Sequence, residues 1–139
     1  ITVMPEFTQA QTELQTLEKQ LSDELQRSSE EFSKKYQEFQ QAMAKDSLPA
    51  NIAERRQNEL QDMSQKIDQF RQKAMQDMEK AQSDKMAPIY KKLDDAIKAV
   101  GAAEGVIYIF DLARTAIPYI NEAQSINLTS KVKAQLGIK

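Results

Sequence analysis

The sequence predicts a mainly α-helical fold: a long antiparallel helical hairpin, a coiled-coil-like arm, that projects from a small trimerising β body. Three observations predict this. Two long segments carry apolar residues at helical spacing, only the turn signal KDSLPAN (45–51) separates them, and a short β-branched and aromatic segment follows two glycines. The arm should cover residues 1–100, and the body, with a short C-terminal helix, residues 101–139. Within the arm we expect a helix over 5–45, a tip over 46–51 and a second helix over 51–100.

The first helix is predicted from an apolar stripe whose steps of three and four residues average close to the 3.6-residue period of a helix. Pro5 stands at the first turn, where proline is tolerated. The four-residue step from Leu21 to Leu25 breaks the heptad pattern, so we expect a rather straight helix with weak supercoiling. The stripe consists of Phe7, Ala10, Leu14, Leu17, Leu21, Leu25, Ser28, Phe32, Tyr36, Phe39 and Met43.

The second helix is predicted from a longer stripe that follows the turn signal. Asn51, with Glu54 three residues later, resembles a capping box at its start. Arg56 occupies one stripe position, so the seam near the tip should not be fully apolar, and Pro88 should kink the helix. The stripe consists of Ile52, Leu60, Met63, Ile67, Phe70, Ala74, Met78, Ala81, Ile89, Leu93, Ala96 and Val100.

The composition changes after Gly101 and Gly105, which should end the helix. Residues 106–112 are β-branched and aromatic and apolar on both faces, which predicts a strand buried on two sides. A second short strand is expected over 116–120, at an edge or a bulge because it contains Pro118. The residues between the two strands should turn the chain back.

The predicted strand pair is too small to be stable alone, and its second face needs a cover. The chain offers only the base of the hairpin and a short terminal helix, which Thr129 should cap and which should end near Leu136. Self-association follows as the natural inference, with several copies sharing a β core and their hairpins projecting outward. The expected body and trimer core consists of Val106, Ile107, Tyr108, Ile109, Phe110, Ile117 and Tyr119.

Composition disfavours several classes of function. The 19 basic and 21 acidic residues nearly cancel, so no long-range attraction to nucleic acid is expected. The chain has no Cys and no His, and it therefore lacks the commonest general base and the usual zinc ligands. We predict no catalytic, cofactor or metal site and no small-molecule substrate, which makes an enzyme the weakest hypothesis.

The sequence contains no targeting signal that identifies the cellular compartment. No run approaches the roughly 20 apolar residues that span a bilayer. The chain begins ITVMPEF, without the basic and apolar regions of a signal peptide. The residues therefore fit either a cytosolic protein or a mature or trimmed form of an exported one.

Three segments resemble the Skp/OmpH family of periplasmic chaperones: APIYKKLDDAIKAV (87–100), VIYIFD (106–111) and INLTSKVKAQLG (126–137). DSLPANIAERRQNELQ (46–61) also resembles the tip of Bacteroidetes-type OmpH-like members. The resemblance covers nearly the whole chain, and its most specific parts are the strand segment and the terminal helix. It implies a homotrimer whose arms enclose a cavity and hold unfolded outer-membrane proteins without ATP. It also implies a periplasmic location, with the signal peptide removed.

This sequence departs from the family pattern in two ways. Family members begin with a strand of the body before the first helix, whereas this chain reaches its first helix at Pro5, so we expect that strand to be missing here. The best-known member is strongly basic, whereas this chain is slightly acidic. The resemblance therefore does not extend to electrostatic capture of anionic clients or lipid head groups, and transient contact with a membrane surface stays open.

Methionine and aromatic side chains on the arm are the candidates for client contact, because methionine is flexible and suits promiscuous binding. Met63, Phe70 and Met78 lie in the stripe, where packing of helix on helix is the favoured interpretation. Met75 and Met86 lie off the stripe, so client contact and simple exposure are equally open for them. The full set of candidates is Phe39, Met43, Met63, Phe70, Met75, Met78 and Met86.

Three functions compete on the sequence alone. The leading hypothesis is an ATP-independent holdase that binds many unfolded chains weakly at several points. The alternative is a structural spacer or adaptor that binds one folded partner. A prefoldin-like chaperone also has paired helices, but its strands lie between them, whereas the predicted strands here follow both helices.

Overall fold

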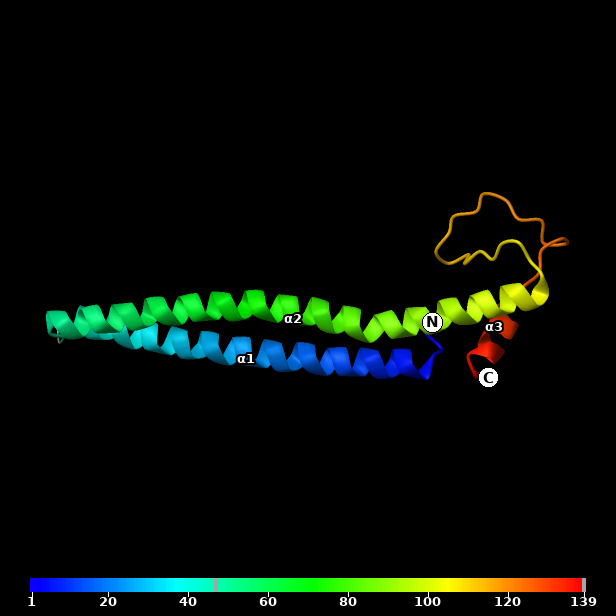
Figure 1. Cartoon of the computed structure of the whole chain (residues 1–139). Helices are drawn as coiled ribbons and strands as arrows, with labels where there is room; N and C mark the ends of the chain where they lie inside the picture. The colour runs from blue at the N-terminus through cyan, green and yellow to red at the C-terminus, as the bar shows by residue number, and fades with distance from the viewer. Residues whose placement is uncertain (47, 139) are drawn as a thin grey trace. The chain divides into compact units, whose positions relative to one another are not determined.

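The computed structural model describes residues 1–46 and 48–138, which contain three helices: α1 (Pro5–Ala44), α2 (Ala50–Glu104) and α3 (Thr129–Gln135) (Figure 1). The prediction of a mainly helical fold with two long helices is confirmed. The chain divides into two compact units. One unit, the base, contains residues 1–10 and 84–139; the other, the arm, contains residues 11–83.

Helix α1 begins and ends close to its predicted limits. The backbone carbonyl of Met4 accepts hydrogen bonds from the N–H groups of Phe7 at 3.0 Å and Thr8 at 3.3 Å, so Met4 precedes the first turn. Pro5 is the first helical residue, as predicted. At the other end the chain leaves the helix shortly before Asp46, whose φ of 49° lies in the left-handed region that follows many helices.

The start of α2 differs from the prediction in its cap. The helix begins at Ala50, and the carbonyl of Pro49 accepts a hydrogen bond from the N–H of Ile52 at 3.0 Å. Asn51 therefore lies inside the first turn, where its Oδ1 accepts from the N–H of Ile52 at 3.0 Å. The capping box predicted from Asn51 and Glu54 is wrong, because proline with its fixed φ already precedes the first helical residue.

The end of α2 also differs from the prediction. The helix continues through Pro88 and Gly101 to Glu104. Gly105 has a φ of 64°, and the N–H of Val106 donates to the carbonyl of Gly101 at 3.2 Å, as expected for a glycine that terminates a helix. Only the second of the two glycines therefore ends the helix, and the kink expected at Pro88 stays a prediction.

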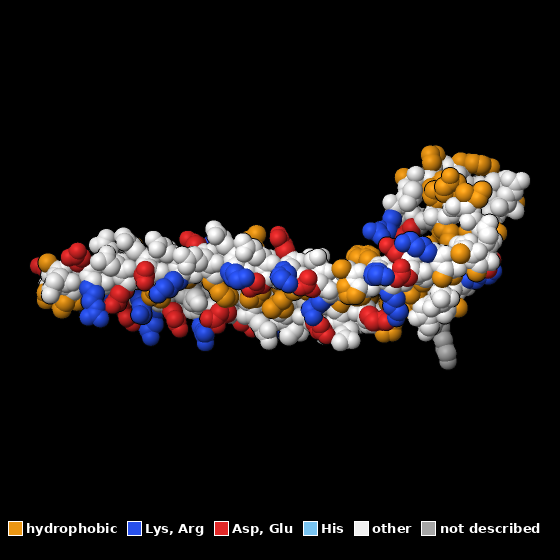
Figure 2. Space-filling view, viewed as in Figure 1, with side chains coloured by type: hydrophobic (Ala, Val, Ile, Leu, Met, Phe, Trp, Pro, Cys, Tyr) orange, Lys and Arg blue, Asp and Glu red, His pale blue; other side chains and the backbone are white. Residues whose placement is uncertain are grey.

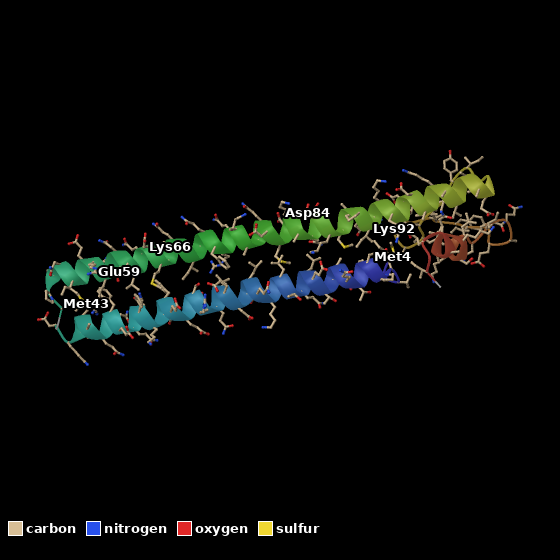
Figure 3. The ribbon with its side chains drawn as sticks, turned by 60° about the horizontal axis from the view of Figure 1, so that its bottom comes forward. Met4, Met43, Glu59, Lys66, Asp84 and Lys92 are labelled. Carbon is tan, nitrogen blue, oxygen red and sulfur yellow. The ribbon has the colours of Figure 1, made fainter. Side chains whose placement is uncertain are left out.

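In the arm, α1 and α2 run side by side and antiparallel (Figures 1 and 3). Leu60 is buried, and most of the other stripe residues in the arm are half-buried. The half-buried stripe residues are Leu14, Leu17, Leu21, Leu25, Phe32, Phe39, Met63, Ile67, Phe70, Ala74, Met78 and Ala81. The outer surfaces carry exposed ion pairs within one helix, such as Lys19 with Asp23 at 2.6 Å, each worth only about 0.3–0.5 kcal/mol. One apolar seam therefore holds the arm together.

The base contains the best-packed cluster of the described chain. Met4 is 1% exposed and packs with Ala10 and Ile89. Apolar residues from both ends of the chain and from α2 pack against this cluster: Ile1, Phe7, Met86, Leu136 and Ile138. Glu6 of α1 forms an ion pair with Lys92 of α2. These contacts bring the first turn of α1, the middle of α2 and the end of α3 together.

Helix α3 is fixed at both ends, but Thr129 does not cap it. Thr129 is its first helical residue, and the side chain of Asn127 accepts the N–H of Thr129 at 3.0 Å. The capping role predicted for Thr129 is therefore wrong, since the N-cap residue is Leu128 and its side chain makes no capping hydrogen bond. Gly137 ends the helix with a φ of 74°, as predicted for a glycine at this position.

Residues 106–128 connect α2 to α3, and no strand is present in the part of the chain that the structure describes. The strands predicted over 106–112 and 116–120 are absent from the single chain. A strand needs a neighbour to pair its backbone groups, and two short strands are only marginally stable by themselves. The turn expected between them is present, because the carbonyl of Asp111 accepts from the N–H of Thr115 at 2.9 Å.

Candidate functional site: two exposed apolar surfaces

Most of the large apolar side chains that are exposed fall into two groups, one in each unit. The loop surface, in the base, consists of Ile107, Tyr108, Phe110, Leu112, Tyr119, Ile120 and Ile126. The arm surface consists of Tyr36, Met43, Ile52 and Met75. Figure 2 shows hydrophobic side chains gathered over the loop that follows α2. Exposed apolar patches as dense as the loop surface are uncommon on monomers and mark sites of interaction, whereas the arm surface consists of separate exposed side chains.

The loop surface is open on one side and anchored on the other. Ile107 is 87% exposed and Tyr108 is 75% exposed, with the ring of Tyr108 6.1 Å from that of Phe110. Ile109 is half-buried, and its Cδ1 lies 3.2 Å from the position that a Cβ on Gly101 would take. The absence of a side chain at Gly101 therefore lets Ile109 lie directly against α2 while its neighbours face outward.

A cation–π contact fixes the loop to α2 a second time. The guanidinium carbon of Arg114 lies 5.4 Å from the centre of the Tyr90 ring. Such a contact at an exposed site stabilises by about 0.5–1 kcal/mol. The loop is thus held on the helix at Ile109 and at Arg114, and the residues of the loop surface between and beyond these anchors remain open to a partner.

The residues expected to form the body and trimer core do not form a core within one chain. Three of them, Val106, Ile109 and Ile117, are half-buried. The other four, Ile107, Tyr108, Phe110 and Tyr119, are exposed. A large apolar side chain gains free energy when it leaves water, so these four side chains favour association. That they meet other copies of the chain stays a prediction.

The arm surface contains stripe residues that the structure leaves exposed. Tyr36, Met43 and Ile52 were predicted to lie in the seam, yet they are 44%, 50% and 40% exposed. The second helix offers little apolar surface near the tip, since Arg56 occupies a stripe position there. Tyr36 instead stacks on Phe32, with ring centres 6.1 Å apart and planes at 13°. The seam prediction is wrong for these three residues.

The tip of the arm carries an open hollow of about 410 Å³. Met43 lies at this end of α1 (Figure 3). The hollow is lined by Met43, Asp46, Leu48, Ala50, Ala53, Glu54 and Gln57. Apolar and acidic side chains are therefore mixed around this hollow. The hollow is open to solvent rather than an enclosed pocket.

The structure separates the candidates for client contact into three environments. Met75 and Met43 are exposed, at 62% and 50%. Phe39, Met63, Phe70 and Met78 are half-buried in the seam, in agreement with the packing interpretation. Met86 is half-buried and packs against the Met4 cluster of the base. Contact of any of these side chains with a client stays a prediction, and exposure now favours Met75 and Met43.

Among the described residues, the ionisable groups with shifted pKa values belong to exposed ion pairs. The hydrogen bond from Lys92 lowers the pKa of Glu6. In the same way the hydrogen bond between Lys91 and Asp95 lowers the pKa of Asp95 and raises the pKa of Lys91. Each shift has a salt-bridge partner as its main cause, so these groups support the helices rather than indicate a catalytic acid or base.

Two further findings concern the described residues alone. They contain no group of three or more side chains that could hold a metal ion. None of their helices is long and apolar enough to cross a membrane.

A long helical hairpin followed by an exposed apolar loop defines a mainly helical protein that leaves a dense apolar surface uncovered in the described chain. A family model described as Outer membrane protein (OmpH-like) matches residues 1–136, and the chain belongs to this family. The resemblance inferred from the residues is therefore confirmed. No curated protein and no solved structure matches the chain.

Proposed function

We propose that this chain is an ATP-independent holdase chaperone of the periplasm, which as a homotrimer holds unfolded outer-membrane proteins in a cavity between its helical arms. The observation that carries the proposal is the loop surface, a dense group of exposed apolar side chains on a member of the OmpH-like family. The family assignment supports a chaperone-type function outside the cytoplasm. The loop surface supports assembly of the chain with further copies of itself.

Assembly would give the loop the neighbours that it lacks in one chain. Residues 106–112 and 116–120 have the β-branched and aromatic composition of strands, and backbone groups in an extended loop can pair with those of another copy. Paired strands from several copies would form the small β body and cover Tyr108 and its exposed neighbours. A closed, symmetric arrangement is the usual way in which a single chain covers such a surface. Folding of the loop and assembly would then be coupled.

Binding of clients is assigned to the arms. The arm surface offers a few exposed side chains, of which Met43 and Met75 are flexible and adapt to different partners. Each contact is weak, but several arms around one client would act together and raise the overall affinity. The single seam of the arm also permits local opening, because few buried contacts oppose it.

Two measurements on the purified chain test the proposal. Light scattering should give the mass of three copies. Dilution of a urea-unfolded outer-membrane β-barrel protein into buffer without nucleotide should leave the client soluble at about one trimer per client. Continued aggregation at several-fold excess of trimer would count against the holdase function. A stoichiometric complex with one folded protein, and no effect on unfolded chains, would favour a spacer or adaptor instead.

A further inference from the structure

Sulfur is present in this chain only as methionine thioether, since the six methionines are accompanied by no cysteine. The structure places these thioethers in very different environments. Met75 is 62% exposed and Met43 50% exposed, both on the arm, whereas Met4 in the core of the base is 1% exposed. The remaining three, Met63, Met78 and Met86, are half-buried. Any reagent that must reach sulfur from solvent will meet Met75 and Met43 first.

Peroxides are reagents of this kind. The sulfur lone pair attacks one oxygen of hydrogen peroxide, the O–O bond breaks, and an S–O bond forms. The sulfur loses two electrons, the transferred oxygen remains on it as a sulfoxide, and the second oxygen leaves as water with both protons. The product is a polar side chain in place of an apolar one. Access of the oxidant to the sulfur therefore sets the order of reaction.

We propose that Met75 and Met43 are oxidation sites, at which a peroxide-class oxidant makes two apolar side chains of the arm surface polar and weakens client binding without unfolding the protein. This inference rests on the proposed holdase function. Among the described residues the arm surface has four large exposed apolar side chains, and these two are half of them. Oxidation would therefore remove a large share of the apolar contact that the arm offers.

The fold should tolerate the change because neither side chain contributes much packing. Substitutions at exposed positions usually change the free energy of unfolding by less than about 0.5 kcal/mol. Oxidation of Met4 would be different, since a polar sulfoxide cannot be accommodated at a position with 1% exposure without disrupting the cluster around it. As long as Met4 is not oxidised, client binding should therefore weaken while the fold is kept.

Peptide mapping after brief treatment with hydrogen peroxide tests the order of reaction. Cleavage after lysine and arginine places Met75 and Met78 in one peptide, 74–80, so an exposed and a half-buried methionine are compared under identical recovery. Met43 falls in peptide 36–45 and Met4 in peptide 1–19. We expect fragment ions to show sulfoxide at Met75 before Met78, and at Met43 long before Met4. Equal rates at Met75, Met78 and Met4 would overturn the proposal.

Client retention before and after oxidation tests the consequence. The untreated protein gives the baseline, and a failure to hold clients at that stage counts against the proposed function itself. With a working baseline, oxidation to completion at Met75 and Met43 should raise the concentration needed for half-maximal retention by at least about fivefold. Circular dichroism should show unchanged helix content over the same time.

The variant carrying Met43→Leu and Met75→Leu is the matched control, because leucine keeps an apolar side chain of similar volume but cannot be oxidised. Its client binding before peroxide serves as its own baseline, and this binding should be unchanged after peroxide. The single variant Met75→Gln should lose part of the binding without any oxidant. Loss of binding in the oxidised leucine variant, or full binding by the oxidised parent, would overturn the proposal.

Discussion

The loop surface and the arm surface are both apolar and exposed, but they are built differently. The loop surface has seven large side chains within residues 107–126, mostly aromatic or β-branched, whereas the arm surface has four spread over residues 36–75. A dense group of stiff side chains suits one fixed partner that can be covered closely. A sparse group with two flexible methionines suits partners that differ and exchange.

The two surfaces also differ in their support. The loop that carries the loop surface is anchored on α2 at Ile109 and at Arg114. The arm surface lies on two helices held by one half-buried seam. A partner of the loop therefore meets a positioned surface, whereas a partner of the arm meets one that can adjust. The predictions below test this division of roles between assembly and client binding.

The largest effect is expected from a charge placed in the loop surface. Ile107 is 87% exposed in the single chain, so Ile107→Asp would have little effect if the chain worked alone. If other copies cover it, the buried carboxylate should abolish assembly. Light scattering should then give the mass of one copy. The matched variant Ile52→Asp on the arm should keep the mass of the parent, and an unchanged mass for both variants would remove the loop from the interface.

The next effect compares two methionines with opposite exposure. Met4→Ala should lower the free energy of unfolding by about 2–4 kcal/mol, because it leaves a cavity in the buried cluster that Met4 forms with Ala10 and Ile89. Met75→Ala should change it by less than about 0.5 kcal/mol. Urea denaturation at one fixed protein concentration measures both, since assembly makes stability depend on concentration. Similar losses for the two variants would contradict the difference in packing.

The spacing of apolar residues predicted the two long helices well, because an amphipathic helix buries its apolar stripe against a neighbouring helix. Leu14 and Leu25 repeat at helical spacing and lie half-buried in the seam as expected. Tyr36 and Met43 have the same spacing but stay exposed. Their burial depends on which residues of α2 lie opposite them, and the sequence of α1 does not specify those residues. Spacing therefore predicted the face of the helix correctly but not how deeply each member is buried.

The structure of the loop between α2 and α3 could not be predicted fully from the sequence. The residues from Val106 to Phe110 predicted a strand buried on two sides, and that other copies cover them stays a prediction. The predicted strands are absent from the single chain, because strand pairing requires a neighbour that one copy does not supply. Composition reveals that a segment is apolar, but it does not reveal what covers that segment. The exposure of Ile107 and Tyr108 was not predictable from their residue types alone.

A smaller effect is expected from the arm surface. Tyr36→Ser together with Ile52→Ser should weaken client retention about threefold, because two of its four large apolar contacts are removed. Gln37→Ser with Gln65→Ser is the matched control, since both glutamines are exposed on the same two helices. The mass of the assembly should not change in either variant. Unaltered retention in the first variant would mean that clients bind elsewhere.

The smallest effect concerns the ion pair between Glu6 and Lys92, which links the two long helices within the base. The hydrogen bond from Lys92 lowers the pKa of Glu6 below its ordinary value of 4.5. The folded state therefore holds its proton less tightly than the unfolded state does, and the pair stabilises the fold at pH above that value. This contribution should disappear as the pH falls through the lowered pKa.

Glu6→Gln isolates this contribution, because the amide keeps the size of the side chain but has no charge to lose. The parent should be slightly more stable than Glu6→Gln at pH 7, and the difference should shrink to zero as the solution is acidified well below pH 4.5. Both side chains are largely exposed, so the difference at pH 7 should be small and should fall further at high salt. A difference that grows on acidification would contradict the pairing. If Glu6→Gln still lowered the stability at pH 7 in a background that carries Lys92→Gln, Glu6 would act through a group other than Lys92.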